Sequence, residues 1–209
     1  MLFNYSSNLT VLVIASIVMV AALIFHNIFQ TFIAARLGDH SPRLAGFGAF
    51  EPRQHLDMFG VVLLLLLGFG WPRQIPVNGR NYRGRQEMLV WYSGPVAYLL
   101  VALLAYTIGV LLAANGGGDA ARGFTVAGST AILHAAINLF PVIPLDGGHA
   151  ALASGSARLR RFVMQLASYG TIGFIVLFLL LNLTGILPRV VGLLHNVILR
   201  LLGLFLPLG

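Results

Sequence analysis

Residues 11–35 read VLVIASIVMVAALIFHNIFQTFIAA, an apolar stretch that is interrupted near its end by His26, Asn27 and Gln30. A helix rises about 1.5 Å per residue, so a helix of this length crosses the hydrocarbon core of a bilayer, which is about 30 Å thick. Polar side chains are costly to bury in such a setting, and they commonly mark a function. The stretch therefore predicts a membrane-spanning helix with a functional site near one end.

The composition of the whole chain also indicates a membrane protein. Of its 209 residues, 58% are hydrophobic and 9% are charged, whereas a soluble domain carries about 25% charged residues. All 13 basic residues are arginines that lie between the apolar runs, which favours membrane topology and anionic lipid over nucleic acid. Without cysteine, disulfides and thiolate metal ligands are excluded. The first ten residues carry no positive charge, so we expect a retained first helix rather than a cleaved signal peptide.

The apolar runs predict an all-α integral membrane protein with four to six transmembrane or re-entrant helices. The run at 58–71 is short for a span and favours a re-entrant helix. Before it, the Gly- and Pro-containing stretch 40–57 allows a short membrane-associated β-hairpin. The expected spans are residues 9–35, 88–114, 124–143 and 162–182, followed by a last apolar helix at 190–207 that either spans or lies at the interface.

We expect a single membrane domain over residues 1–209, with a core at 8–150 and C-terminal helices at 160–209. If the 58–71 segment returns to its own side, ten arginines collect on one side of the membrane and two remain on the other, with Arg200 ambiguous. The positive-inside rule then places the basic side in the cytoplasm and the N-terminus outside, in a bacterial cytoplasmic membrane. If that segment spans instead, most of the bias disappears.

A second polar feature follows the third expected span, where residues 138–148 read NLFPVIPLDGG. Asp146 is the acid expected at membrane depth, because the others lie in loops or at a span boundary. The two prolines interrupt the helix, and irregular backbone at this depth is tolerated where protein buries it or where it lines a cavity. With a re-entrant 58–71 segment, Asp146 and His26 reach similar depth on the same side, and we expect them to share a site.

These stretches together resemble the site-2 protease family of intramembrane zinc metalloproteases. NLFPVIPLDGG is similar to the family's Asn-x-x-Pro…Leu-Asp-Gly motif, and RLGD, FGWPRQIPVN and SGPVAYLL occur in the matching order. The likeness covers most of residues 20–150. In that family the first helix carries His-Glu-x-x-His, in which two histidines one turn apart bind zinc and the glutamate is the general base. The aspartate of the second motif is the third protein ligand.

The resemblance places the first zinc-binding histidine at His26, the aspartate ligand at Asp146 and the motif asparagine at Asn138. The general base falls on Asn27, and the second histidine falls on Gln30. An amide has no basic site of useful pKa, and its neutral oxygen is a weak zinc ligand beside imidazole. The chain thus keeps two of three zinc ligands and lacks the base.

Three further residues bear on this site. Tyr98 stands where the family tends to carry an asparagine. His134, one helical turn before the motif asparagine, and His149, three residues after Asp146, could each replace the missing ligand. We favour the simpler interpretation, in which His134 hydrogen-bonds within the bundle and His149 lies at the wet end of the site. His26 is then a buried polar group that is satisfied by the second motif.

The pattern predicts a catalytically inactive relative that acts as a structural or assembly subunit of a larger membrane complex. Its expected partners are other membrane subunits and lipid, with no nucleic acid and no bound cofactor. One alternative is an active intramembrane zinc metalloprotease with non-standard ligands, and only that alternative requires zinc. Another is a polar intramembrane path for protons or a small ligand, formed by His26, His134, Asn138 and Asp146.

Overall fold

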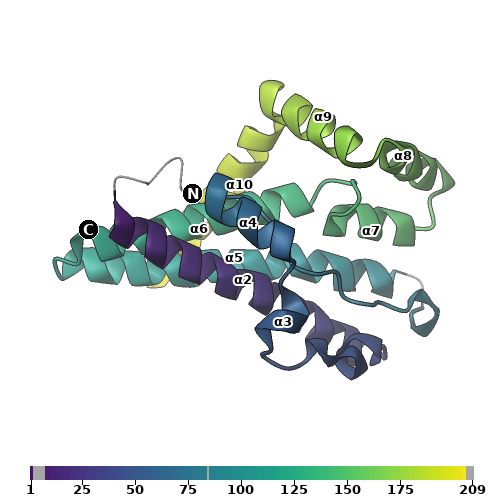
Figure 1. Ribbon diagram of the computed structural model, residues 1–209, viewed down its shortest axis with the longest axis horizontal. Coiled ribbons are helices and arrows are strands. Elements are labelled where there is room, and N and C mark those ends of the chain that lie inside the picture. Colours follow the sequence, from purple (N-terminus) through teal and green to yellow (C-terminus); the bar gives the residue numbers. More distant parts are fainter. Residues whose placement is uncertain (2–7, 84, 206–209) are drawn as a thin grey trace.

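The computed structural model describes residue 1 and residues 8–83 and 85–205, which form an arrangement of helices (Figure 1). No β-strand occurs in these residues, and the prediction of an all-α membrane protein is confirmed. The helices are α2 (Leu9–Arg36), α3 (Pro52–His55), α4 (Met58–Leu67), α5 (Gln86–Ala114), α6 (Gly118–Asn138), α7 (Asp146–Ala153), α8 (Ala157–Ser168), α9 (Gly170–Leu183) and α10 (Ile186–Phe205). Single helical turns lie at Arg43–Phe47 and Gly79–Asn81.

Helices α2, α5 and α6 run side by side and pack against one another (Figure 1). Small side chains let helix backbones approach closely within a membrane. Where α6 meets α5, a Cβ on Gly128 would lie 2.9 Å from the ring of Tyr106, so a larger residue does not fit. The buried alanines of this contact are Ala15 and Ala22 in α2, Ala102 and Ala105 in α5, and Ala127, Ala131 and Ala135 in α6. The three helices thus form the frame that holds both polar motifs.

The predicted spans at 9–35 and 88–114 correspond to α2 and α5, which are long and apolar enough to cross a membrane. The same holds for residues 186–204 of α10. The span expected at 124–143 corresponds to α6, which begins and ends earlier. The composition of α6 is less apolar than that of α2 or α5. This difference follows from its position, since α6 is a packed helix whose buried face is built largely from glycine and alanine.

The segment expected to span at 162–182 is not one straight helix, and it forms a broken span or a re-entrant loop. The chain instead forms two helices, α8 and α9, which meet at an angle of 112°. Gly170, the first residue of α9, has a φ of +56°, a left-handed conformation that glycine adopts without a steric penalty. The amphipathic α8 therefore runs in a different direction from the apolar α9.

The short apolar segment around α4 enters and leaves at the same level of the fold. Its ten helical residues are about 15 Å long, which is half of the hydrocarbon thickness. The chain turns at Gly68 and comes back against α4, where a Cβ on Gly60 would lie 2.2 Å from the carbonyl oxygen of Trp71. An isolated antiparallel bridge joins Leu56 to Pro72. The segment thus has the shape of a re-entrant loop.

The β-hairpin considered for 40–57 does not form in the described residues. This stretch makes the helical turn at Arg43–Phe47 and the short helix α3. Pro52 occupies the first turn of α3, where a missing N–H costs nothing, and the Glu51 carboxylate accepts a hydrogen bond from the Arg53 amide. Local helix-start signals therefore decide the structure here.

Candidate functional site

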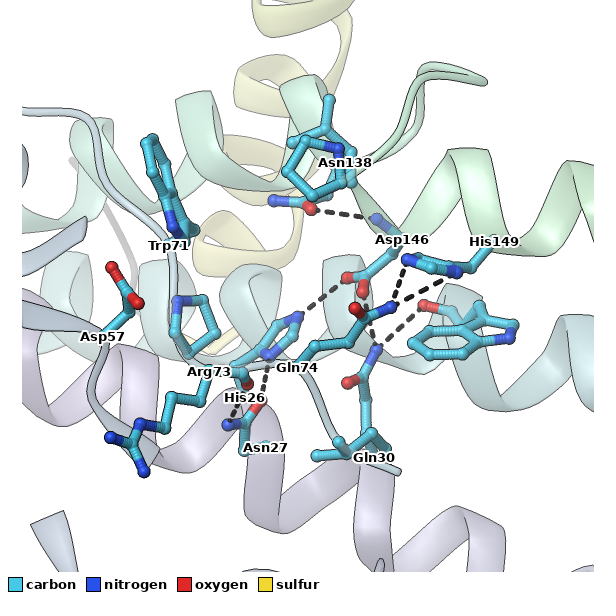
Figure 2. A pocket seen from close by; sticks show the side chains of 15 residues that line it. His26, Asn27, Gln30, Asp57, Trp71, Arg73, Gln74, Asn138, Asp146 and His149 are labelled. Atoms are coloured by element: carbon cyan, nitrogen blue, oxygen red, sulfur yellow. Dashed lines mark hydrogen bonds and ion pairs between the residues drawn. The ribbon is translucent and has the colours of Figure 1, made fainter. Parts of the chain in front are cut away.

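The two polar features of the sequence meet in space, 120 residues apart along the chain (Figure 2). His26 Nε2 lies 2.8 Å from Asp146 Oδ2, and Gln30 Nε2 donates a hydrogen bond of 3.0 Å to Asp146 Oδ1. The two α2 residues reach one carboxylate because side chains four positions apart share a helix face. All three side chains are buried. The carboxylate is therefore held by α2 through both of its oxygens.

The second motif acts on the backbone that presents Asp146. The Asn138 side chain accepts a hydrogen bond from the Asp146 amide at 3.3 Å and donates one to the His134 carbonyl at 2.9 Å. A Cβ on Gly147 would lie 2.4 Å from the Phe140 carbonyl oxygen, and a Cβ on Gly148 would lie 2.5 Å from the carbonyl carbon of Val142. Glycine is required at both positions for the start of α7 to pack on this turn, which directs Asp146 toward α2.

Gly94 of α5 closes the third side of the site. A Cβ at this position would lie 2.2 Å from Asp146 Oδ2, 2.3 Å from His26 Nε2 and 2.6 Å from Gln30 Nε2. No side chain other than hydrogen fits there without moving the hydrogen-bonded group. The sequence analysis missed Gly94, although the quoted stretch SGPVAYLL contains it.

Pro95 gives Gln30 a second hydrogen-bond partner. In an α-helix the N–H of residue 95 would donate to the carbonyl of Trp91, but proline has no N–H. Gln30 Nε2 donates to this carbonyl at 3.2 Å. Both N–H groups of the Gln30 amide therefore face atoms that only accept, namely a carboxylate oxygen and a backbone carbonyl. This pairing fixes the orientation of the amide and turns its oxygen away from Asp146.

Asn27 links His26 to the segment that returns from the re-entrant loop. His26 Nδ1 donates to Asn27 Oδ1 at 3.0 Å, and Asn27 Nδ2 donates to the Arg73 carbonyl at 2.8 Å. An ionised glutamate at this position would place a second acceptor against that carbonyl, whereas the amide supplies the donor. Asn27 thus holds residues near Arg73 across the site.

The two histidines considered as replacement ligands have other partners. In His134, Nδ1 donates to the Thr130 carbonyl at 2.8 Å and Nε2 accepts from the Gly70 amide at 3.2 Å, so both ring nitrogens are used. His149 stacks on Trp91 with 4.4 Å between ring centroids and is hydrogen-bonded to Gln74. His134 therefore anchors the re-entrant loop to α6, and His149 lies at the edge of the site (Figure 2).

Tyr98 lies between the two buried imidazoles. Its ring centroid is 4.8 Å from that of His26 and 5.4 Å from that of His134. The side chain is completely buried, and its hydroxyl has no hydrogen-bond partner within the described part of the chain. Tyr98 therefore contributes packing to the floor of the site rather than a polar contact.

A cavity of about 270 Å³ adjoins this group. Its polar wall contains His26, Asn27, Gln30 and Asp146, and Figure 2 shows these side chains pointing toward one another. The cavity is also lined by residues that the sequence analysis did not assign to the site, namely Asp57, Trp71, Arg73, Gln74 and Trp91. For Trp71, Arg73 and Gln74, the signal in sequence was the resemblance of FGWPRQIPVN to the family pattern, whereas Asp57 and Trp91 lie outside that stretch.

The donor set does not fit a protein zinc site. Catalytic zinc takes three protein ligands and structural zinc takes four. His26 and Asp146 are suitable ligands, but Gln30 presents N–H groups to the carboxylate, and His134 and His149 have other partners. Among the residues that the structure describes, no three His, Cys, Asp or Glu side chains are grouped so that they could hold a metal. His26 and Asp146 instead bond with each other.

Comparison with known proteins agrees with the motifs. The chain is 32% identical over 173 residues to the Bacillus subtilis (strain 168) protein named "Putative zinc metalloprotease YwhC", and the match covers 78% of each chain. This chain belongs to the site-2-protease-like family of membrane metalloproteases. No family model matches it, and no solved structure matches it. Family membership agrees with the order of the two motifs in the sequence. Asn27 and Gln30 differ from the glutamate and histidine of the family's first motif.

Proposed function

We propose that this family member does not cleave peptide bonds and acts as a structural or assembly subunit of a membrane complex. The observation that carries the proposal is the hydrogen bonding of Gln30. Its amide donates to Asp146 and to the Trp91 carbonyl that Pro95 leaves free, so the position of a third zinc ligand is used to stabilise the protein itself.

The position of the general base supports the same proposal. Hydrolysis by a metalloprotease requires a group that takes a proton from the attacking water. Asn27 cannot do so near neutral pH, and both ends of its side chain are hydrogen-bonded, one to His26 and one to Arg73. The remaining acid of the cavity, Asp57, accepts a hydrogen bond from the Gly60 amide at the start of α4. It caps that helix instead of joining the group around Asp146.

The partners we propose are other membrane protein subunits. None of the described side chains of α9 is buried, although this apolar helix attaches to the core through stacking of Phe69 with Phe174 and Phe178. A helix that is held at one face and apolar on the others suits packing against further membrane helices. Purification from the native membrane in mild detergent should therefore yield the chain with companion subunits, and migration alone would contradict this part of the proposal.

We further propose a bacterial cytoplasmic membrane with the site facing the cytoplasm and the N-terminus outside. Arginines are concentrated in the segments that flank the site, as the positive-inside rule requires of cytoplasmic loops. The re-entrant shape of the α4 segment supports this orientation, because it keeps the arginines before and after it on one side. Cysteines introduced at Arg83 and Arg122 should react with a membrane-impermeant reagent from opposite sides.

An active zinc metalloprotease is the second candidate, and the name of the YwhC relative favours it. Zinc measurements on the purified chain separate the two, with Gln30→His as the matched control because it restores a second imidazole one turn from His26. We expect no stoichiometric zinc in the native chain and a gain of zinc in Gln30→His. Stoichiometric zinc in the native chain that is lost in Asp146→Ala would overturn the proposal.

A polar path for protons finds no support in the hydrogen bonds. Asn138 contacts the Asp146 amide and the His134 carbonyl, which are both main-chain groups, and the His134 ring faces Gly70 and Thr130. The polar side chains therefore form two separate groups rather than one continuous chain of exchangeable protons.

A further inference from the structure

A second cavity lies beside the site, at the bend between α8 and α9. Its volume is about 220 Å³, and its lining is apolar. One wall is formed by Trp71 and residues 143–145, and the other by Ala167, Gly170 and Phe174. Trp71, Pro144 and Leu145 also line the polar cavity, so the two spaces adjoin. The proposed function uses neither this cavity nor α8.

Helix α8 carries three arginines, Arg158, Arg160 and Arg161, at the other end from this cavity. All three are exposed, and α8 contains no acidic residue. In the described part of the chain, the ion pairs are formed by His26 with Asp146 and by Arg122 with Asp119, so these three arginines have no acidic partner. Unpaired arginines on an amphipathic helix attract anionic headgroups.

The helix connects the charge to the cavity. Arg160, Met164 and Ala167 follow one another at spacings of four and three residues, so they lie on one face of α8. Arg160 and Ala167 are separated by about 10 Å along the helix axis, at about 1.5 Å per residue. Met164 between them is 56% exposed and offers an apolar surface. The face thus leads from a positive charge to the mouth of an apolar cavity.

We propose that this face binds one anionic phospholipid, with its headgroup at Arg160 and Arg161 and one acyl chain in the cavity at the α8–α9 bend. Charge complementarity selects the headgroup, and the apolar lining selects the chain. Because Trp71 and Leu145 separate the cavity from the polar site, the bound chain would pack against the turn that presents Asp146. The inference does not depend on whether the site binds zinc.

The chain provides its own reporter for this proposal. It contains two tryptophans, of which Trp71 lines the apolar cavity and Trp91 lies on the far side of the polar site against His149. In Trp91→Phe, fluorescence reports on Trp71 alone. The full chain is placed in phosphatidylcholine vesicles that contain a small fraction of lipid with brominated acyl chains, which quench tryptophan on contact.

We expect brominated phosphatidylglycerol to quench Trp71 at a lower fraction than brominated phosphatidylcholine does. Arg160→Gln and Arg161→Gln should each raise the fraction required by about fivefold, since one arginine near an anionic surface has an effect of that order. Arg189→Gln, which removes an exposed arginine at the start of α10, is the matched control and should leave the fraction unchanged. Ala167→Leu should reduce quenching by filling the cavity.

Three results would overturn the proposal. Equal quenching by the two brominated lipids would show that the cavity does not select an anionic headgroup. An effect of Arg189→Gln equal to that of Arg160→Gln would show that binding does not depend on the arginines of α8. A Trp71 that neither lipid quenches would show that a protein segment covers the cavity. The comparison of the two lipids uses the same protein throughout, so it remains decisive even if Ala167→Leu fails to fold.

Discussion

The two halves of the polar site differ in what their residues do. In the second motif, Asn138, Gly147 and Gly148 act on the backbone, and Asn138 and Gly147 match the family pattern. In the first motif, Asn27 and Gln30 act through their side chains, and each departs from it. The resemblance thus implies that residues that shape the backbone are kept, while those that would supply the base and one zinc ligand are replaced.

Under the proposed function, this difference would let the site remain intact without a metal. Zinc would hold a carboxylate and imidazoles together by coordination. Here, a hydrogen-bonded pair of His26 and Asp146 and the amide of Gln30 hold the same elements together. Buried polar groups in a membrane must find partners, and amides at positions 27 and 30 provide them. If these hydrogen bonds stabilise the fold in place of a metal, substitutions that remove them should destabilise it.

The largest effect is expected for Asp146→Ala, which should lower the free energy of unfolding by about 3–5 kcal/mol. Removing one partner of a buried pair leaves His26 and Gln30 without the acceptor that they share. Unfolding in detergent, followed by circular dichroism, measures the change. Asp119→Ala, whose exposed ion pair with Arg122 is 3.4 Å long, is the control and should cost less than about 1 kcal/mol.

The same measurement separates hydrogen bonding from metal binding. If hydrogen bonds hold the site, a strong chelator leaves the unfolding of the unmutated chain unchanged. A chelator that lowers its stability to that of Asp146→Ala would show that a metal holds the two motifs together.

A somewhat smaller effect is expected for Gly94→Ala, which brings a methyl group against all three hydrogen-bonded side chains. Such overpacking should lower the free energy of unfolding by about 1–3 kcal/mol. Gly192→Ala in α10 is the matched control, because no heavy atom lies within 4 Å of a Cβ there. Alanine is the better helix former, so this control should be neutral or stabilising. Equal losses in both variants would mean that the site tolerates the methyl group.

Much of this architecture could be predicted from the sequence, because apolar runs and motif order are local signals. The α2 and α5 spans and the re-entrant α4 segment follow from run length and from the arginine distribution. The bend at Gly170 could not be predicted, since the sequence does not reveal the φ of a glycine that lies beside an apolar run. The β-hairpin considered for 40–57, a stretch that the structure describes in full, does not form, because Glu51 and Pro52 are residues that start a helix at this point.

The site shows the same division. His26, Gln30 and Asp146 could be named from motif spacing. Their meeting with Gly94 could not, because it depends on how closely α5 packs against α2 and α7. The role of Pro95 had a readable signal, since a proline within a helix frees the carbonyl four residues earlier.

Asp39 provides an internal comparison for Asp146, since both are buried carboxylates that accept hydrogen bonds from several side chains. It lies in the loop after α2 and accepts hydrogen bonds from the Ser41 amide, the Asn78 amide, the Asn81 side chain and the Tyr82 hydroxyl, at 2.8–3.0 Å. Burial alone would raise the pKa of Asp39, but these hydrogen bonds outweigh burial and the pKa lies below its usual value. The carboxylate thus joins two loops through hydrogen bonds.

Because the folded-state pKa of Asp39 is depressed, its stabilisation is present above the unfolded-state pKa, about 4, and is lost as pH falls through the folded value. Asp39→Asn should lower the free energy of unfolding at pH 7 by about 1–3 kcal/mol, as expected for hydrogen bonds to a charged group. The variant should also show a weaker loss of stability in acid. Parallel pH profiles for the two proteins would contradict this assignment.

The smallest expected effect is the coupling between Gln30 and Pro95, at about 1 kcal/mol, the net value of one hydrogen bond. Gln30→Leu leaves the Trp91 carbonyl without a donor, but in the Pro95→Ala background the restored N–H of residue 95 can take its place. Gln30→Leu should therefore cost less in that background, and a double-mutant cycle measures the difference in unfolding free energy. Asn27→Leu removes an amide of the same helix that bonds to the Arg73 carbonyl instead, so its cycle with Pro95→Ala should be additive. Additivity in both cycles would mean that Gln30 is held by Asp146 alone, which would leave its amide free to turn its oxygen toward a metal.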